Sequence, residues 1–477
     1  MKRTTLAYAS SVWLSVGLFA CGSDPESKPG QIGDGCTAGS AEGACATGLS
    51  CDPLAEGSSF VCGAPVTIRG TVVDALTQQP IGGGRVVAVA ADGSPVGDVG
   101  YSDAQGEYSL VVSAPRNADG SVAEAAKWTL AVSAQGYQPF PAGPRPAVPI
   151  FASQIVKAGE LQAVNTGVAL LPISHPELYA RQVAGNISGP DPGGTLVVAE
   201  GATVPAPYAI ASRSGEFVLF NVPAGSFELA GYKRGQQLAR ASVDVSTSSV
   251  RDIRLERTEV PLGEVSGSVN IVNAPGGSLT SVVLVPQSVF DATLQRGPIP
   301  LGLRAPGLPE APSISGQFTF ADVPLGNYVV LAAFENDGLV RDPDTSIGGT
   351  SIQTVTVVPG QNIAMSQSFK ITEQLAIIRP GAEAPERVSG PVVFEWADDS
   401  SEDRYELELY TALGDLVWED RAVPSGRGSA GVELAYSGPA LLDGMIYQFR
   451  VTSFRDRGAP TAISRSEDLR GVFEYRQ

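Results

Sequence analysis

The chain of 477 residues holds a single histidine, His175, and none of its five cysteines lies beyond Cys62. One histidine excludes an HExxH zinc site and a histidine cluster. It also leaves no spare member for a Ser-His-Asp triad, and its place beside a proline in "LPISHPEL" is typical of a loop. A Walker loop and a dinucleotide fingerprint are missing as well. We therefore expect no catalytic residue, no metal site and no cofactor.

Positive charge is scarce, because 32 Lys and Arg stand against 50 Asp and Glu, for a net charge of −18. Such a chain repels nucleic acid and anionic lipid, so neither is an expected electrostatic partner. Carboxylates are spread along the chain, so no glycosidase pair stands out. The acidic loops 116–121 and 342–346 lack the spacing of a calcium loop and are predicted to be ordinary turns.

Long apolar runs are missing too. A helix that spans a bilayer needs about 20 apolar residues. The apolar stretch from Leu6 to Ala20 is shorter and is interrupted by serines. Because Lys2 and Arg3 precede it, residues 1–20 are predicted to be a signal peptide and not a permanent anchor.

The end of that segment, Leu18-Phe19-Ala20-Cys21, resembles the bacterial lipobox, in which a leucine stands three residues before the cysteine and a small residue just before it. Phe19 occupies a place where a small or aliphatic residue is usual. The resemblance implies cleavage before Cys21 and attachment of fatty acyl chains such as palmitate, which together anchor a protein stably to a membrane. Gly22, in place of the aspartate that commonly retains lipoproteins at an inner membrane, implies the outer membrane.

The alternative for Cys21 is an ordinary secretory signal with cleavage elsewhere. Lipidation of Cys21 leaves an even set of four cysteines, whereas the alternative can leave an odd reactive thiol outside the cell. We therefore favour lipidation. Residues 21–34 contain Gly, Ser, Pro and charged residues without an apolar period, and they are predicted to be a flexible tether.

Residues 35–64 place four cysteines among Gly, Ala and Ser, with too little apolar material for a core. Crosslinks must hold such a segment together, and export permits disulfides. Intervals of eight, five and ten residues do not offer the close CxxC pairs of a zinc site. Three disulfide connectivities are possible, and we favour Cys36–Cys51 with Cys45–Cys62.

An internal repeat organises the rest of the chain. Gly106-Glu107-Tyr108, Gly215-Glu216-Phe217 and Gly316-Gln317-Phe318 each open an alternating segment, which predicts a strand with one buried face. In the second and third copies, "NVPAG" and "DVPLG" predict a turn into the next strand. Opening strands are expected at 66–74, 183–189 and 264–272, apolar strands at 85–91, 195–201 and 280–286, and closing segments at 167–173, 241–256 and 354–369. Roughly seven short strands per unit predict a β-sandwich.

This order resembles the carboxypeptidase regulatory-like fold, a transthyretin-type β-sandwich grouped with starch-binding-like and Cna-B-type modules. The first unit carries "IRGTV" from Ile68, "TQQPIGGGRV" from Thr77 and "SDAQGEYSL" from Ser102, and the later units lack the middle motif. The resemblance implies sandwiches at 65–174, 181–258 and 260–372. It implies no peptidase activity, because the module accompanies a separate catalytic domain in that family.

Two insertions depart from the repeat, at 115–130 in the first unit and at 287–314 in the third. Long loops on a rigid sandwich are where binding usually occurs. The alternative, which we favour, is a tolerated surface excursion. The binding residues are therefore unknown at this stage.

Residues 374–477 resemble a fibronectin type III-like sandwich, with Trp396 in an early strand, then "YELELY" and later "YQFRV". Trp396 and Tyr447 are predicted core residues, because a half-buried sandwich needs large apolar fillers. Glu406 and Glu408 alternate with apolar residues, which predicts one solvent-facing side.

The sequence thus predicts an all-β chain of tandem β-sandwich domains that follow a small disulfide-rich segment. We expect a non-catalytic lipoprotein of a bacterial cell envelope, anchored in the membrane, that displays its sandwiches for structural or interaction roles toward a protein or polysaccharide. A carbohydrate-binding protein is the alternative and would use an exposed platform such as Trp128 or Trp418, although core packing is the expected fate of both. A hydrolase would need clustered carboxylates with perturbed pKa values in a pocket.

Overall fold

The computed structural model describes residues 29–477 except 38–43, 142–146, 158, 163–165, 273–279, 293–296, 309, 334–351, 366–367, 373–374, 400–401, 413–414, 427–430 and 468–469. Cys21, the predicted signal peptide 1–20 and the acidic loop 342–346 lie outside the described residues. Strands form nearly all of the regular structure, so the all-β prediction is confirmed. No helix in the described ranges is long and apolar enough to cross a bilayer.

The cysteine module, residues 30–64, is a small sheet of β1 (Gly35–Cys36), β3 (Phe60–Gly63) and β2 (Ser50–Pro53), in that order. Its disulfides join Cys36 to Cys51 and Cys45 to Cys62, the pairing that the sequence favoured. Residues 30–34 were predicted to belong to the tether, but Gly30 bridges to Cys45 and the amide of Gly33 donates to the carbonyl of Cys62 (2.9 Å). Backbone pairing orders this stretch, and its one large apolar side chain, Ile32, is 57% exposed and lies beside Gly120 of the first sandwich.

Three sandwiches follow, and each has two sheets. In the first sandwich (65–174), the first sheet contains β4 (Val66–Asp74), β7 (Glu107–Val112), β10 (Ile155–Lys157), β11 (Glu160–Leu161) and β12 (Val168–Leu170). Its second sheet contains β5 (Arg85–Ala90), β6 (Gly100–Tyr101), β8 (Lys127–Ser133) and β9 (Ile150–Phe151). In the second sandwich (181–258), the first sheet contains β13 (Arg181–Ile187), β16 (Glu216–Val222) and β20 (Val250–Leu255). Its second sheet contains β14 (Leu196–Glu200), β15 (Tyr208–Ile210), β17 (Ser226–Lys233), β18 (Gln236–Gln237) and β19 (Ala241–Asp244). In the third sandwich (260–372), the first sheet contains β21 (Gly263–Val272), β24 (Gln317–Val323), β27 (Asn362–Ala364) and β28 (Phe369–Thr372). Its second sheet contains β22 (Ser281–Pro286), β23 (Arg304–Ala305), β25 (Gly326–Ala333) and β26 (Gln353–Val357).

The three sandwiches share one topology. The opening strand β4, β13 or β21 pairs antiparallel with β7, β16 or β24 and parallel with a closing strand. The central pair of the second sheet is β5 with β8, β14 with β17, and β22 with β25. The repeat found in the sequence is therefore a repeat of structure.

A glycine and an aromatic ring face each other at the same place in every sandwich. Gly70 lies opposite Tyr108, Gly185 opposite Phe217, and Gly267 opposite Phe318. A Cβ on Gly185 or Gly267 would lie 2.6 Å from the partner ring. The aromatic side chain thus covers the glycine across the strands, which explains why both residues recur together.

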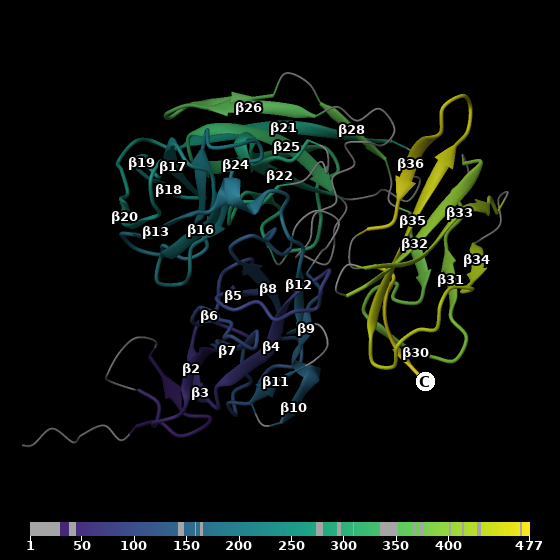
Figure 1. The fold of residues 1–477 in the computed structure, drawn as a ribbon, viewed down its shortest axis with the longest axis horizontal. Helices are drawn as coiled ribbons and strands as arrows, with labels where there is room; N and C mark the ends of the chain where they lie inside the picture. The colour runs from purple at the N-terminus through teal and green to yellow at the C-terminus, as the bar shows by residue number, and fades with distance from the viewer. Residues whose placement is uncertain are drawn as a thin grey trace, which may run out of the picture.

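The second and third sandwiches share a hydrophobic core. On β14, Val197 and Ala199 face the interior of the second sandwich, whereas Leu196 and Val198 pack with β22 and β25 of the third. All six residues of β22 are buried. The second sheets of these two sandwiches therefore pack face to face, and Figure 1 shows the two sandwiches lying against each other above the first.

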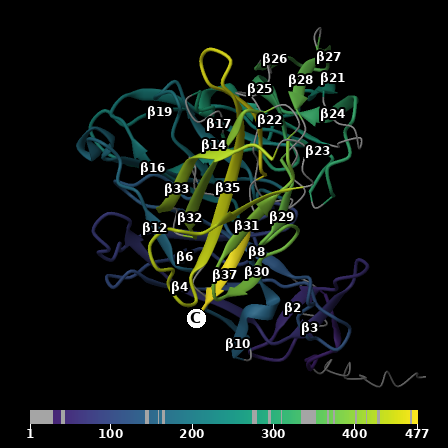
Figure 2. The same cartoon turned by 90° about the vertical axis from the view of Figure 1, so that its right-hand side faces the viewer.

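The C-terminal sandwich, residues 374–477, stands beside the other three (Figures 1 and 2). One sheet contains β29 (Ile377–Arg379), β31 (Val393–Trp396) and β34 (Val432–Ala435), and the other contains β30 (Glu386–Ser389), β32 (Arg404–Thr411), β33 (Leu416–Pro424), β35 (Ile446–Arg455), β36 (Thr461–Arg465) and β37 (Val472–Arg476). Trp396 and Tyr447 are buried in its core, as predicted. Ile446 and Val472 pack with Val148 of the first sandwich.

Candidate functional site

The described residues bring together one group with the composition of a metal site, Cys36, Cys45 and Cys62. All three are disulfide-bonded, so they offer no thiolate to a metal ion. His175 lies exposed in a turn with a left-handed backbone, beside the carboxylate of Glu177 (3.3 Å). It has the loop position that the sequence indicated.

The acidic loop 116–121 forms a turn. The Asp119 carboxylate accepts hydrogen bonds from the Ser121 amide (2.9 Å) and hydroxyl (2.5 Å), and these bonds lower the pKa of Asp119. An aspartate that bonds its own backbone two residues on is the usual chemistry of a turn.

The three tryptophans in the described part of the chain do not form the exposed platform that a carbohydrate-binding protein would use. Trp128 and Trp396 are 1% and 0% exposed, and the Trp128 indole donates to the carbonyl of Ser113 (3.1 Å). Trp418 is half-buried and stacks on Phe394 with ring centroids 6.0 Å apart. Core packing was the expected fate of Trp128 and Trp418, and both pack against their own sandwich.

What the structure does assemble is a series of junctions between modules. At the first, Arg116 from the β7–β8 connection reaches into the cysteine module. Its Nε and Nη2 donate to Oδ2 of Asp52 (3.0 and 2.7 Å), and both side chains are at most 3% exposed. Further hydrogen bonds reach the carbonyl of Ala64 and, from the Arg116 amide, the carbonyl of Pro53. Two nitrogens of the Arg116 guanidinium thus bond one oxygen of the Asp52 carboxylate. Both groups are shielded from water, so water cannot replace either partner.

At the second junction, the end of β16 in the second sandwich docks on the first through Asn221, the last residue but one of that strand. The side chain of Asn221 accepts from the amide of Gly136 (2.7 Å) and donates to the carbonyl of Tyr137 (2.6 Å). Two longer bonds join it to the side chain of Gln135 and the carbonyl of Ala134. Asn221 has a φ of 58°, a backbone conformation that asparagine adopts more readily than most residues.

At the third junction, the end of β24 and the short connection to β25 dock the third sandwich on the second in a similar way. The amide of Gly235 donates to the carbonyl of Asp322 (2.9 Å), and Gln237 Oε1 accepts from the amide of Leu325 (2.8 Å). Asp322 also has a φ of 58°. Here the contact uses the backbone of Asp322, whereas the second junction uses the side chain of Asn221.

One region of the topology, the end of β7, β16 or β24 together with the connection that follows it, therefore holds each sandwich to the module that precedes it. Within the insertion 115–130, Arg116 is buried in the junction and residues 127–130 belong to β8, whereas residues 117–119 are exposed.

The loop 287–314 of the third sandwich also has a role that the sequence did not reveal. Its Leu301 lies next to Gly93 of the first sandwich and Gly194 of the second, 3.3 and 2.7 Å from where a Cβ would stand on each. The carbonyl of Leu301 accepts from the amide of Arg234, and that of Ser288 from the amide of Ala206. The predicted surface excursion is wrong: the loop packs where all three sandwiches meet.

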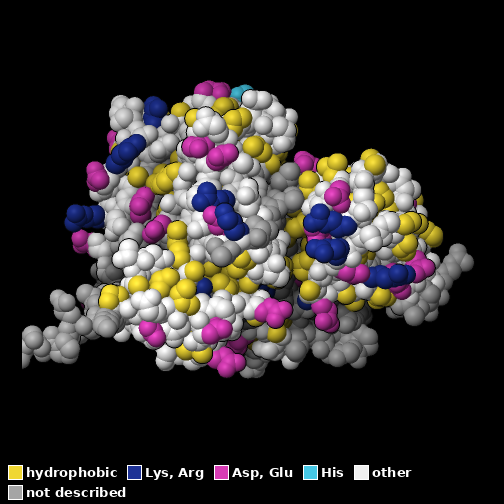
Figure 3. Space-filling model, turned by 90° about the horizontal axis from the view of Figure 1, so that it is seen from below, with side chains coloured by type: hydrophobic (Ala, Val, Ile, Leu, Met, Phe, Trp, Pro, Cys, Tyr) yellow, Lys and Arg dark blue, Asp and Glu magenta, His cyan; other side chains and the backbone are white. Residues whose placement is uncertain are grey.

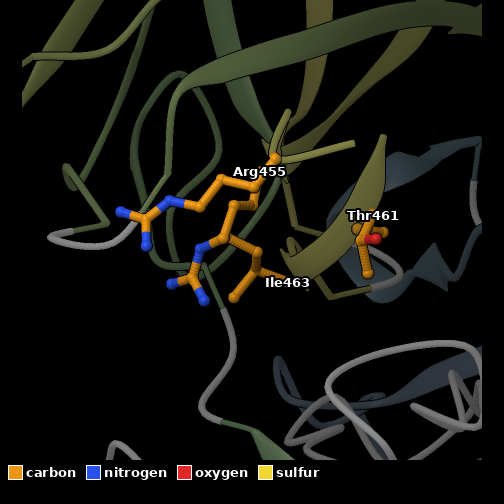
Figure 4. Close-up of a pocket in the computed structure, with 5 residues that line it drawn as sticks. Arg455, Thr461 and Ile463 are labelled. Carbon is orange, nitrogen blue, oxygen red and sulfur yellow. The ribbon is translucent and has the colours of Figure 1, made fainter. Parts of the chain in front are cut away.

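Two hollows remain as candidate ligand sites. A groove of about 480 Å³ lies between the second and third sandwiches. A cleft of about 230 Å³ lies on the β35–β36 hairpin, where Thr461 at the start of β36 pairs with Arg455 and Ile463 lies two residues further along β36 (Figure 4). On the face seen in Figure 3, basic side chains lie beside acidic ones and do not gather into a broad patch. That mixture suits neither nucleic acid nor an anionic membrane surface.

No family model matches the chain, and no curated protein sequence matches it. Solved structures that it resembles include the TIE protein of Bacillus anthracis, at 12% identity and a TM-score of 0.15 over 83% of this chain and 68% of that one. A second is the minor pilin GBS52 of Streptococcus agalactiae, at 13% identity and a TM-score of 0.18 over 43% of this chain and 100% of that one. A third consists of two B repeat units of the collagen binding protein of Staphylococcus aureus, at 11% identity and a TM-score of 0.17 over 86% of this chain and 99% of that one. Likeness at this level carries no argument about function, and the sandwich fold rests on the sheets described above.

The sequence contained one signal for the face-to-face packing. Strands β14 and β22 read "LVVAE" and "SVVLVP", continuous apolar runs without the alternation of a half-exposed sheet. Such runs are typical of strands that are buried on both faces. The docking residues Arg116, Asn221 and Leu301 had no comparable signal, because each contacts a segment that is remote in the sequence.

Proposed function

We propose that this chain is a non-catalytic lipoprotein of a bacterial cell envelope, in which three β-sandwiches are held as one rigid stack and displayed for structural or interaction roles. One observation carries the proposal: in each successive sandwich, the end of β7, β16 or β24 or the connection that follows it docks on the module before it. A chain of independent binding modules would gain nothing from such contacts, whereas a spacer or a fixed presenting surface requires them.

The residues of the repeat support assigning the three sandwiches to the carboxypeptidase regulatory-like class. The cross-strand pairs of glycine and aromatic residue come from the two motifs that carry that resemblance. In this proposal the class supplies the scaffold only. The activity of the chain would then lie in its surfaces and junctions.

Small-angle X-ray scattering tests the rigid stack. The full chain with Cys21→Ala, which removes the acceptor of the lipid, is the sample. We expect one conformation with the docked arrangement of Figure 1 to reproduce the scattering curve. A curve that requires an ensemble of extended and bent chains would contradict the proposal, because flexible linkers between modules produce such ensembles.

The membrane anchor needs its own experiment. The wild type and Cys21→Ala are expressed in a bacterial host, and their intact masses and membrane fractionation are compared. We expect acyl mass on the wild type and its recovery with membranes, and a soluble variant. If both proteins are soluble and Cys21 is unmodified, the anchor is wrong and a freely secreted protein takes its place. Fractionation of inner and outer membranes then tests the outer-membrane assignment.

A further inference from the structure

The groove between the second and third sandwiches is formed by residues of both. Glu200 comes from β14 and Tyr232 from β17, while Ser288 and Phe290 come from the start of the loop 287–314. Val204 at its rim is 84% exposed, and Phe290 is nearly buried. At about 480 Å³, the groove falls within the range of small-molecule sites.

Several planar polar groups converge in this groove. The Glu200 carboxylate accepts from the Tyr232 hydroxyl at 2.5 Å, and burial together with that carboxylate raises the pKa of Tyr232, so the pair holds its proton on tyrosine. Arg240 contacts Glu228 at 3.4 Å with both side chains about half exposed, a weak ion pair that leaves its guanidinium available. Asn327 accepts from the hydroxyl of Thr356, and no described residue accepts from its amide nitrogen.

Ser288 adds an observation that points to a ligand. Its hydroxyl oxygen is buried and has no hydrogen-bond partner, although its carbonyl is bonded to the amide of Ala206. A buried hydroxyl without a partner costs free energy, and proteins satisfy nearly all such groups. Because this oxygen is buried, the Ser288 side chain must rotate toward the groove before a ligand hydroxyl can satisfy it.

The strands that line the groove do not favour a peptide. Extended peptides bind by adding a strand to a free sheet edge. Here β14 is paired on both sides by β15 and β17, and β25 by β22 and β26. A peptide would therefore lack main-chain partners along these strands. A net charge of −18 on the chain also disfavours an anionic ligand.

We propose that this groove binds a neutral oligosaccharide. Carboxylate, guanidinium and carboxamide groups each present two hydrogen-bonding atoms in one plane, which suits pairs of neighbouring hydroxyls on a sugar ring. Glu200, Arg240 and Asn327 contribute these groups, Ser288 takes one further hydroxyl, and Val204 covers an apolar face of a ring. The site goes beyond the proposed scaffold role, and it depends on the fixed docking of the two sandwiches.

The test uses the full chain with Cys21→Ala on an array of neutral glycans that includes α-glucans, β-glucans, chitin oligomers and mannans. Titration calorimetry then measures the affinity for the glycan that binds. We expect Asn327→Ala, Arg240→Ala and Ser288→Ala each to weaken binding about fivefold to tenfold, the effect of one lost hydrogen bond. Arg251→Ala is the matched control, since Arg251 lies exposed on β20, outside the groove, and we expect it to leave the affinity unchanged.

Ser288→Ala separates binding from folding. Because the hydroxyl has no partner in the free protein, its removal should leave the thermal midpoint equal or higher while it weakens glycan binding. The proposal is overturned if the array shows no neutral glycan, or if the groove variants bind as the wild type does. It is also overturned if a peptide array yields ligands that the same variants lose. The scattering curve of each variant shows whether the stack is intact, so failure of the docking is distinguished from failure of the site.

Discussion

The first junction and the second solve the same problem with different chemistry. Arg116 and Asp52 form a buried ion pair between the cysteine module and the first sandwich. Asn221 uses neutral hydrogen bonds to the backbone of the turn at 134–137, between the first and second sandwiches. The preceding module differs in each case: the cysteine module is a small disulfide-bonded sheet with little core of its own, whereas the first sandwich offers an ordered turn.

This comparison shows that the end of β7, β16 or β24, with the connection that follows it, is a recurring docking position that uses different groups toward each neighbour. A buried ion pair gives little net stability when intact but a large loss when one partner is removed. Neutral bonds to the backbone lose less, since each contributes about 1 kcal/mol. Substitutions at the two junctions should therefore differ in size, and the third junction should respond least.

The largest effect is expected at the first junction. Arg116→Ala leaves the Asp52 carboxylate buried without its partner, and we expect a loss of about 3–5 kcal/mol in the free energy that holds the cysteine module on the first sandwich. Limited proteolysis and chemical denaturation measure it. Arg69→Ala is the control, because Arg69 forms an exposed ion pair with Glu160 (3.5 Å). Equal losses for the two variants would show that the junction does not depend on the buried pair.

A smaller effect is expected at the second junction. Asn221→Gly keeps a residue that tolerates the φ of 58° and removes two short and two longer hydrogen bonds. Counting about 1 kcal/mol for each of the two short bonds, we expect a loss of about 2 kcal/mol. Asp322→Gly is its matched partner at the third junction, where the backbone carbonyl makes the contact and survives the change. We expect that variant to stay within about 1 kcal/mol of the wild type. Calorimetry of both proteins checks the difference, and similar losses would remove the distinction between the two junctions.

The smallest effect at neutral pH is expected in the shared core of the second and third sandwiches. Burial raises the pKa of Tyr208 to about 12, and Tyr208 packs against that core. The unfolded chain releases this proton near pH 10, so the stabilisation is complete below pH 10 and is lost as the pH rises toward about 12. Tyr208→Phe should match the wild type at pH 7 and exceed it in stability above pH 10. Parallel alkaline denaturation curves for the two proteins would contradict this assignment.

Most strands were predictable because their residues alternate or form short apolar runs between turn residues. The first unit shows this best: the expected strand 66–74 is β4 with the same bounds. The tether prediction failed at residues 30–34, where backbone bonds to the cysteine module replace apolar contacts. The loop 287–314 was misjudged because its length and its prolines are as typical of a solvent-exposed loop as of a loop packed between domains. Only the segments that it contacts distinguish these two cases.

By itself, the sequence determined the all-β class, the repeat, the even set of cysteines and the lipobox-like segment that predicts a membrane anchor. These depend on residues close together in the chain, whose spacing governs local structure and processing. Only the tertiary structure decided that the sandwiches form a stack, that Arg116 meets Asp52 and that a groove opens beside Ser288. Such contacts join segments separated by tens of residues, and their geometry arises when sheets pack face to face.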